Sequence, residues 1–175
     1  MRKPLISAMA LSLSVLVLPA AAQDARSVTL QTGVPAYCQS TPWGQSASIN
    51  LEELADGNGF LKSSFSGTTS LATTANYYCN APAKVTLSAT PLSNPIAVVD
   101  TQSFVNRVDY TATLTWGSIT GSTSSQAAAP TELSTPQAHT GIMQLAVSNP
   151  VIPSGDRPIA GNYTGQVTLT VTAQP

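Results

Sequence analysis

Residues 158–175 read PIAGNYTGQVTLTVTAQP, a turn followed by a strictly alternating segment. Val167, Leu169 and Val171 fall on one face of the strand that this alternation predicts, because successive side chains of a strand point to opposite faces. The threonines between them fall on the other face. No later residue is available to cover the apolar face, so we expect another segment, of this chain or of a second chain, to supply the missing neighbour.

Further strands are predicted along the rest of the chain, each rich in β-branched and aromatic residues and bounded by turn residues. Prolines fall between these segments, where a missing amide hydrogen removes no ladder hydrogen bond. Short strands in this number predict an all-β fold, and specifically a β-sandwich. The predicted strands are 27–34, 46–51, 70–78, 84–90, 107–116, 141–147 and 163–172.

The N-terminus has the three parts of a secretory signal peptide: a basic start at Met1–Lys3, an apolar run at Leu5–Leu18 and small residues at Ala20–Ala22. The apolar run is shorter than the roughly 20 residues that a membrane-spanning helix needs. We therefore expect residues 1–22 to be a signal peptide, the mature protein to be exported, and no direct insertion into a membrane.

The composition of the chain indicates which classes of binding partner are disfavoured. Only 9% of residues are charged, the formal net charge is −1, and no basic cluster occurs. This pattern disfavours nucleic acid and anionic lipid surfaces as partners. Without the signal peptide, the remaining residues have the usual length of one domain.

Cys38 and Cys79 are the two cysteines of the chain. In an exported protein such a pair is most simply a structural disulfide bond. A thiol nucleophile or a metal site would need further residues that the sequence does not supply.

Residues 118–140 are nearly all Ser, Thr, Ala, Gln, Gly and Pro, and this composition predicts a long mobile loop. The loop is either an exposed variable surface on a rigid scaffold or a linker between strands. It contains the single histidine, His139, which we expect to be solvated. Residues 51–56 predict a short helical connector.

The sequence offers no constellation for catalysis, for a cofactor or for a metal. It contains no G-x-S-x-G nucleophile elbow, no phosphate-cradling glycine loop and no cluster of zinc ligands. Trp116 shares a strand face with Tyr110, Ala112 and Leu114 and is expected in the core. Trp43, between Pro and Gly, is the best candidate for an exposed ring that could stack on a carbohydrate. The sequence thus predicts no enzyme.

The order of these features resembles a known family. The second cysteine stands in Tyr78–Asn80 and precedes the segment Lys84–Ala89, a strand centred on Tyr110 follows, and Ala160–Tyr163 leads into Val167–Val171. This order resembles the spore coat U domain family, the pilin-like subunits of archaic, Csu-type chaperone–usher pili.

The resemblance implies an incomplete immunoglobulin-like β-sandwich over residues 37–175, which lacks its final strand. In that family the N-terminal extension of one subunit completes the groove of the next subunit by strand addition. Residues 23–36 would be this extension and would carry the candidate donor strand, whose apolar stripe is interrupted by Thr32. The stripe consists of Val28, Leu30 and Val34, and the C-terminal turn and strand contain Gly161, Tyr163, Val167, Leu169 and Val171.

The resemblance also implies partners and a location. The partners are a periplasmic chaperone, an outer-membrane usher and other pilus subunits. The location is the periplasm and then a fibre at the cell surface, with roles in adhesion and biofilm formation.

A self-complete sandwich is the alternative that the residues leave open. In it, residues 27–34 form the first strand of their own domain, and the protein is a secreted binding module for carbohydrate or protein. The two hypotheses differ in one observable property, because a fibre subunit polymerises head to tail whereas a binding module is a stable monomer.

Overall fold

The structure, a computed structural model, describes residues 29–39, 49, 51, 53–63, 67–70, 77–152 and 157–174. The chain divides into two compact units, Met1–Gly33 and Val34–Pro175. We call the second unit the domain. The predictions for the signal peptide 1–22, for Val28 and for Trp43 lie outside the described residues.

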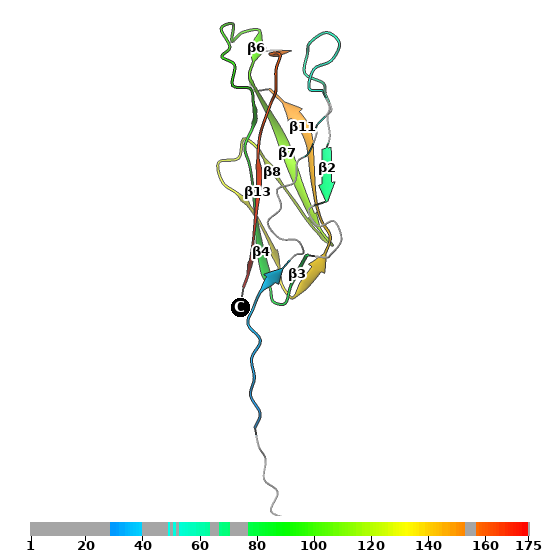
Figure 1. Ribbon diagram of the computed structural model, residues 1–175, viewed down its shortest axis with the longest axis vertical. Coiled ribbons are helices and arrows are strands. Elements are labelled where there is room, and N and C mark those ends of the chain that lie inside the picture. Colours follow the sequence, from blue (N-terminus) through cyan, green and yellow to red (C-terminus); the bar gives the residue numbers. More distant parts are fainter. Residues whose placement is uncertain are drawn as a thin grey trace, which may run out of the picture. The chain divides into compact units, whose positions relative to one another are not determined.

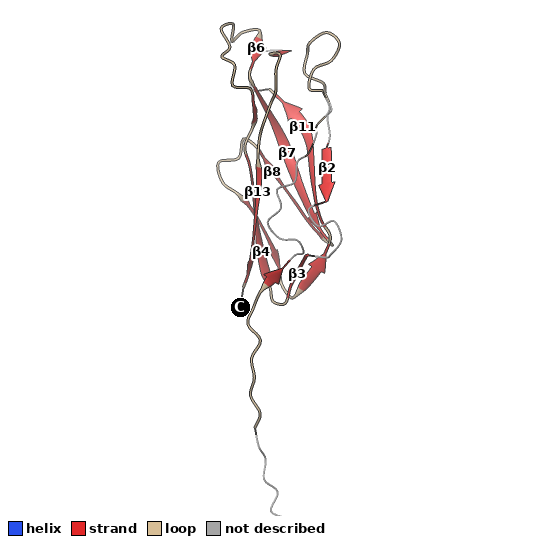
Figure 2. Ribbon diagram, viewed as in Figure 1, coloured by secondary structure: helices blue, strands red, loops and turns tan. Residues whose placement is uncertain are grey.

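The domain is all-β, as the sequence predicts, and its described residues contain no helix (Figure 1 and Figure 2). Every strand pairing is antiparallel except that of β12 with β6. The strands are β1 (Cys38–Gln39), β2 (Gly67–Ser70), β3 (Tyr77–Cys79), β4 (Ala83–Ala89), β5 (Leu92–Ser93), β6 (Phe104–Val105), β7 (Arg107–Trp116), β8 (Ile119–Ser124), β9 (Thr131–Thr135), β10 (His139–Gly141), β11 (Met143–Val151), β12 (Arg157–Pro158) and β13 (Val167–Ala173).

The first sheet is built around the longest strand, β7. This strand pairs with β11 along one edge and with β8 and β5 at the two ends of the other edge, and β2 pairs with the far edge of β11. The alternation of β7 explains its central place, because its apolar residues from Tyr110 to Trp116 are all buried between threonines. Near Asn149, whose φ is 52°, the register of β11 shifts by an extra residue, which is a β-bulge.

The second sheet has the order β13-β4-β9, so that β4 lies between the other two strands. Ala83, Val85 and Leu87 of β4 face inward and are at most 1% exposed. Strand β13 runs antiparallel to β4 over its whole length, with Val167 opposite Ala89 at one end. Among the described strands, the second sheet therefore ends at β13 on one side.

The inner faces of the two sheets form one hydrophobic core. Buried side chains of β4, from the second sheet, belong to the same cluster as those of β7 and β11, from the first. Two sheets that share a core in this way make a β-sandwich. Trp116 is 1% exposed and its Nε1 donates a hydrogen bond to the Tyr77 carbonyl at 3.2 Å, which confirms that this ring packs in the core.

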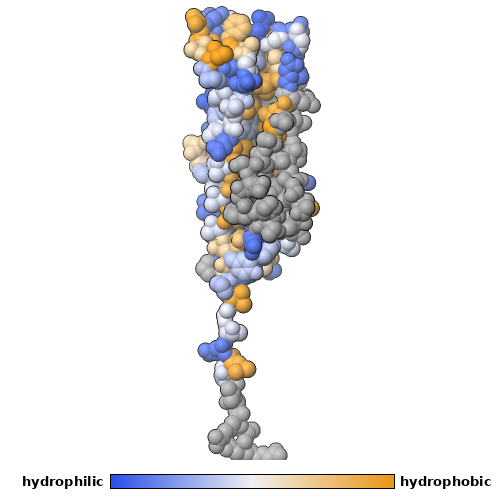
Figure 3. All heavy atoms as spheres, viewed as in Figure 1, coloured by the Kyte–Doolittle hydropathy of each residue, from blue (hydrophilic) through white to orange (hydrophobic). Residues whose placement is uncertain are grey.

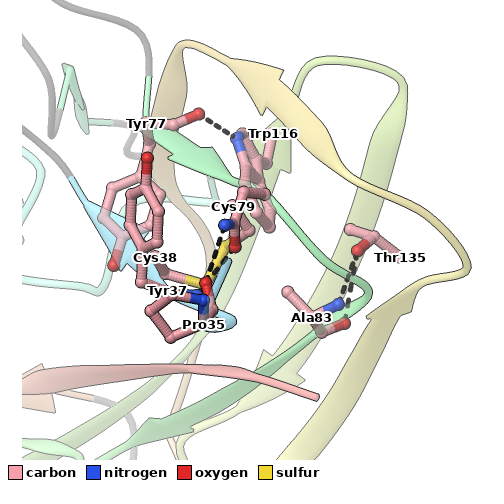
Figure 4. The surroundings of a disulfide bond; sticks show 9 residues. Pro35, Tyr37, Cys38, Tyr77, Cys79, Ala83, Trp116 and Thr135 are labelled. Atoms are coloured by element: carbon pink, nitrogen blue, oxygen red, sulfur yellow. Dashed lines mark hydrogen bonds between the residues drawn. A yellow bond between two sulfur atoms is a disulfide. The ribbon is translucent and has the colours of Figure 1, made fainter. Parts of the chain in front are cut away.

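A small third sheet carries the disulfide bond (Figure 4). Its order is β1-β3-β10, and Cys38 of β1 lies directly opposite Cys79 of β3. The two residues form a disulfide bond, as the sequence predicts. Because Cys38 lies at the start of the described strands, the bond fixes the beginning of the domain to its body.

The prediction of a mobile loop over residues 118–140 was wrong. Strands β8 and β9 and the first residues of β10 occupy this segment. Strand β8 follows β7 through the two-residue turn Gly117–Ser118, in which Gly117 has a φ of 59°. A glycine at the first position of such a turn permits the backbone conformation that matches the twist of a hairpin. The polar composition reflects strands with one solvated face, not the absence of strands.

The prediction of a solvated His139 was also wrong. This residue belongs to β10, is half-buried, and packs its ring against the Trp116 indole with centroids 4.6 Å apart. Its Nε2 lies 3.1 Å from the Trp116 carbonyl oxygen. Pairing of β10 with β3 brings the ring to this place, a contact between distant segments that the local sequence does not reveal.

Two further local predictions differ from the structure. The described part of 51–56 contains no helix, and Ala55 instead forms an antiparallel bridge with Leu61 across a turn. The described part of the predicted strand 27–34, which is residues 29–34, forms no strand. Both segments are too short to specify a structure without partners.

Candidate functional site

The candidate site is the edge of β13 that faces away from β4, which we call the open edge. One edge of β13 pairs with β4, and no strand of the described residues pairs with the other edge. Unpaired N–H and C=O groups along an edge are a template for strand addition. Figure 1 shows β13 as a long strand that runs down the domain and ends near β1.

The inward side chains of β13 are incompletely covered. Val167, Leu169 and Val171 are half-buried and pack against the core, whereas their partners on β4, including Val85 and Leu87, are at most 1% exposed. Among the described strands, only β4 pairs with the strand that carries this row of apolar side chains. Separate patches of hydrophobic residues (orange) lie among polar ones on the face of the domain that Figure 3 shows.

The hydrogen-bond register of β13 assigns its open edge to particular residues. The Thr90 N–H donates to the Gln166 carbonyl at 2.8 Å, and the Gln174 N–H donates to the Pro82 carbonyl at 2.7 Å. Hydrogen-bonded pairs alternate with non-bonded pairs in an antiparallel ladder. The even-numbered residues of β13 therefore bond to β4. The odd-numbered residues direct their N–H and C=O groups to the open edge and their apolar side chains to the core.

A polar corner positions the start of β13. The Tyr163 hydroxyl shares its hydrogen between the carbonyl oxygens of Val105, at 3.0 Å, and Ile159, at 3.1 Å. Burial raises the pKa of this hydroxyl. Gly161 has a φ of 133°, and a Cβ there would lie 2.6 Å from the Asn94 Nδ2, so glycine is required on two grounds. The corner precedes the strand, which begins at Val167 and not at Tyr163 as the sequence predicts.

The N-terminal segment carries the complementary features. Leu30 is 90% exposed and Val34 is 79% exposed, and residues 29–37 form no strand. An exposed leucine and valine on an extended segment without a strand partner can be buried only by association. With Thr32 between them, they share the even-numbered face on which Val28 also falls.

Polar clusters elsewhere in the domain have structural roles. The buried Asp109 carboxylate accepts hydrogen bonds from Arg107 at 2.9 Å, Ser125 at 3.0 Å and Gln126 at 3.0 Å. These bonds tie β7 to the turn after β8 and satisfy the carboxylate. In the described part of the chain, no group of three or more His, Cys, Asp or Glu side chains could hold a metal ion. No helix in that part is long and apolar enough to cross a membrane.

Comparisons with known proteins yield no relative from which a function could be transferred. No model of a known protein family matches the chain, and no curated protein matches it. The geometry of the domain is therefore the basis for a proposed function.

Proposed function

We propose that this protein is a structural subunit of a secreted surface fibre that assembles by exchange of strands between chains. The observation that carries the proposal is the open edge of β13, where half-buried apolar side chains and backbone groups that no described strand pairs lie on the same odd-numbered residues. A strand added there would bury the side chains and bond the backbone at once.

The occupant that fits this edge is the N-terminal segment of a second copy of the chain. The core-facing positions of β13 are 167, 169, 171 and 173, and the even-numbered stripe of the segment is 28, 30, 32 and 34, so each has four positions. Each covers about 20 Å at roughly 3.3 Å per residue. No proline occurs from 28 to 34, so every residue of the segment can donate a ladder hydrogen bond.

The open edge also supports assignment of the protein to a chaperone–usher pilus. A sandwich that lacks one strand, with Tyr163 at a corner before β13, suits an immunoglobulin-like pilin of the spore coat U kind. A chain with an uncovered apolar row needs protection before assembly, which a periplasmic chaperone and an outer-membrane usher would provide. Export by the predicted signal peptide, followed by assembly on the cell surface for adhesion and biofilm formation, completes the proposal.

The alternative of a self-complete binding module needs residues 27–34 as a strand of their own sandwich. The described residues of this segment form no strand, and Leu30 is 90% exposed. The two surfaces that sequence analysis suggested for a ligand also offer no support, because residues 118–140 are folded into strands and Trp43 lies outside the described residues. We therefore favour the fibre subunit.

Size-exclusion chromatography with light scattering on the mature protein tests the proposal. We expect the full-length protein to form heat-stable polymers and a variant without residues 23–34 to be a labile monomer. A free peptide of residues 23–34 should restore the thermal stability of this monomer. The matched control is the same peptide with Leu30→Asp, which places a charge in the core and should not bind. A full-length monomer that refolds reversibly without a partner would overturn the proposal.

A further inference from the structure

We propose that Asn80 is a positioning residue that fixes the conformation of residues 35–37, the part of the domain from which the N-terminal segment leaves. Its consequence for the fibre rests on the proposed function, but the contact itself belongs to the single chain. The residues concerned, Pro35 to Gln39 and Tyr77 to Asn80, all lie within the domain.

Three hydrogen bonds join Asn80 to the segment before the disulfide bond. The Tyr37 N–H donates to the Asn80 Oδ1 at 2.7 Å, and the Asn80 Nδ2 donates to the Pro35 carbonyl at 2.9 Å. The Asn80 N–H donates to the Tyr37 carbonyl at 3.1 Å. One residue thus bonds both the N–H and the C=O of Tyr37 and, in addition, the carbonyl two residues earlier.

The amide side chain of Asn80 continues the ladder of β1 and β3 beyond the end of β3. Gln39 pairs with Tyr78 and Cys38 pairs with Cys79, so the next pair in this register is Tyr37 with Asn80. The chain then leaves the ladder toward Pro82, which has no N–H to donate. The side-chain amide, which has one acceptor and two donor hydrogens, takes the place of the missing peptide group.

The neighbouring side chains hold the same segment. The rings of Tyr37 and Tyr78 meet edge to face with centroids 6.0 Å apart, and the Tyr78 hydroxyl donates to the Gln39 Oε1 at 3.2 Å. Figure 4 shows Pro35 and Tyr37 beside the disulfide bond. Order in the N-terminal segment therefore extends three residues beyond Cys38, to Pro35.

These contacts add little that the fold itself requires. Asn80 is exposed, and exposed hydrogen bonds contribute little net stability because water competes for the same groups. Cys38 is already anchored by a covalent bond. What the contacts determine is the conformation of residues 35–37, and hence the place where the free segment begins.

The free segment begins at Val34, which is itself the last apolar residue of the candidate donor stripe. No unrestrained residue then separates one domain from the strand that it donates to the next, so two domains must abut. The exit also lies near the end of β13, since β1 contacts β13. Asn80 would consequently make the joint between subunits short and stiff.

Hydrogen exchange at single-residue resolution on the full-length protein tests the contact in any assembly state. We expect the Tyr37 amide to be protected in the wild type and to exchange about tenfold faster in Asn80→Ala. Asn80→Asp retains the acceptor for the Tyr37 N–H and should retain most of this protection. Asn162→Ala, at another exposed asparagine, is the control and should change nothing. A Tyr37 amide that exchanges in the wild type as fast as the same residue in an unstructured peptide overturns the proposal.

Electron microscopy of the polymers tests the consequence. Loss of the Asn80 side chain frees Pro35 and Ala36, a linker of roughly 8 Å root-mean-square length, so we expect Asn80→Ala fibres to bend more and to have a shorter persistence length than the wild type. Thermal stability of the polymers should be unchanged, because the donated strand is the same. Fibres of equal stiffness would refute the role of Asn80 in the joint. If the wild type forms no polymers, the proposed function fails, whereas the exchange experiment still decides the contact.

Discussion

Thr32 is the one polar residue on the even-numbered stripe of the N-terminal segment. If the segment docks against β13 as proposed, this hydroxyl faces the core of the neighbouring domain. Thr32→Val should therefore strengthen each joint by about 1 kcal/mol, since a methyl group replaces a hydroxyl without a defined partner. The guanidinium concentration at which polymers dissociate measures this effect.

The neighbouring residue provides the control for Thr32. Gln31→Val adds apolar surface on the opposite face of the same segment, so the dissociation midpoint should not rise. A rise for Gln31→Val without one for Thr32→Val would show that the stripe faces the other way.

The buried phenol of Tyr77 should make the folding stability of the domain fall at alkaline pH. Burial raises the pKa of its phenol to about 12, while the phenol of the unfolded chain ionises near 10. The folded state therefore resists ionisation. This contribution to stability is complete below about pH 10 and is lost as the pH rises through about 12.

Urea unfolding of Tyr77→Phe measures this contribution. Between about pH 9 and pH 11.5, the wild type should lose more stability than the variant, because phenylalanine does not ionise. Part of the loss should remain in the variant, since burial also raises the pKa values of Tyr110 and Tyr163. Equal losses in both proteins would contradict the assignment to Tyr77.

At the scale of elements, the register of β13 makes a prediction about proline. The Val171 N–H points to the open edge, so Val171→Pro should leave the pairing with β4 in place and prevent strand addition. The Thr170 N–H points to β4, so Thr170→Pro should destabilise the domain itself by about 3 kcal/mol. Circular dichroism of the variants without residues 23–34, in the absence of donor peptide, measures domain stability. Light scattering of the full-length variants measures polymerisation.

Val171→Ala separates the loss of the side chain from the loss of the N–H. It should weaken polymers without abolishing them. If Val171→Pro destabilised the domain as much as Thr170→Pro, the odd-numbered residues of β13, and not the even-numbered ones, would bond to β4.

The sequence predicts those strands in which apolar and polar residues alternate. The buried row of β7 and the alternation of β13 are visible in the order of residues, because each strand has one core face and one solvated face. The strands of segment 118–140 are not evident from the sequence, because they contain few large apolar residues. The dipeptide Gly117–Ser118, directly after the β7 alternation, is a hairpin signal that could have revealed β8.

The candidate site was only partly predictable for a similar reason. Apolar stripes on β13 and on the N-terminal segment follow from the residues alone. The open edge, by contrast, depends on which strands pair, and the hydrogen bonds of Asn80 depend on the approach of residues 43 or more positions apart. No local pattern encodes such contacts.

At the scale of the whole molecule, the disulfide bond is the main covalent restraint. It closes a loop with a sequence separation of 41 residues, which corresponds to about 4 kcal/mol in the loop-closure treatment. We expect Cys38→Ala combined with Cys79→Ala to lower the unfolding free energy of the peptide-saturated domain by about this amount. Denaturant unfolding with and without reductant checks it, because reductant should affect the wild type and leave the double variant unchanged. A double variant as stable as the oxidised wild type would contradict the prediction.

The coincidence of apolar side chains and free backbone groups on the same residues of β13 also governs errors of assembly. A strand that docks one residue out of place turns its apolar side chains to the solvent while its backbone can still bond, so almost all of the burial is lost. A shift of two residues restores the burial of the side chains together with the backbone hydrogen bonds, and only the contacts at the ends of the strand are lost. The docking register of misassembled joints should therefore differ from the correct register by two residues or a multiple of two. The edge of the sheet thus selects its partner by dipeptide repeats.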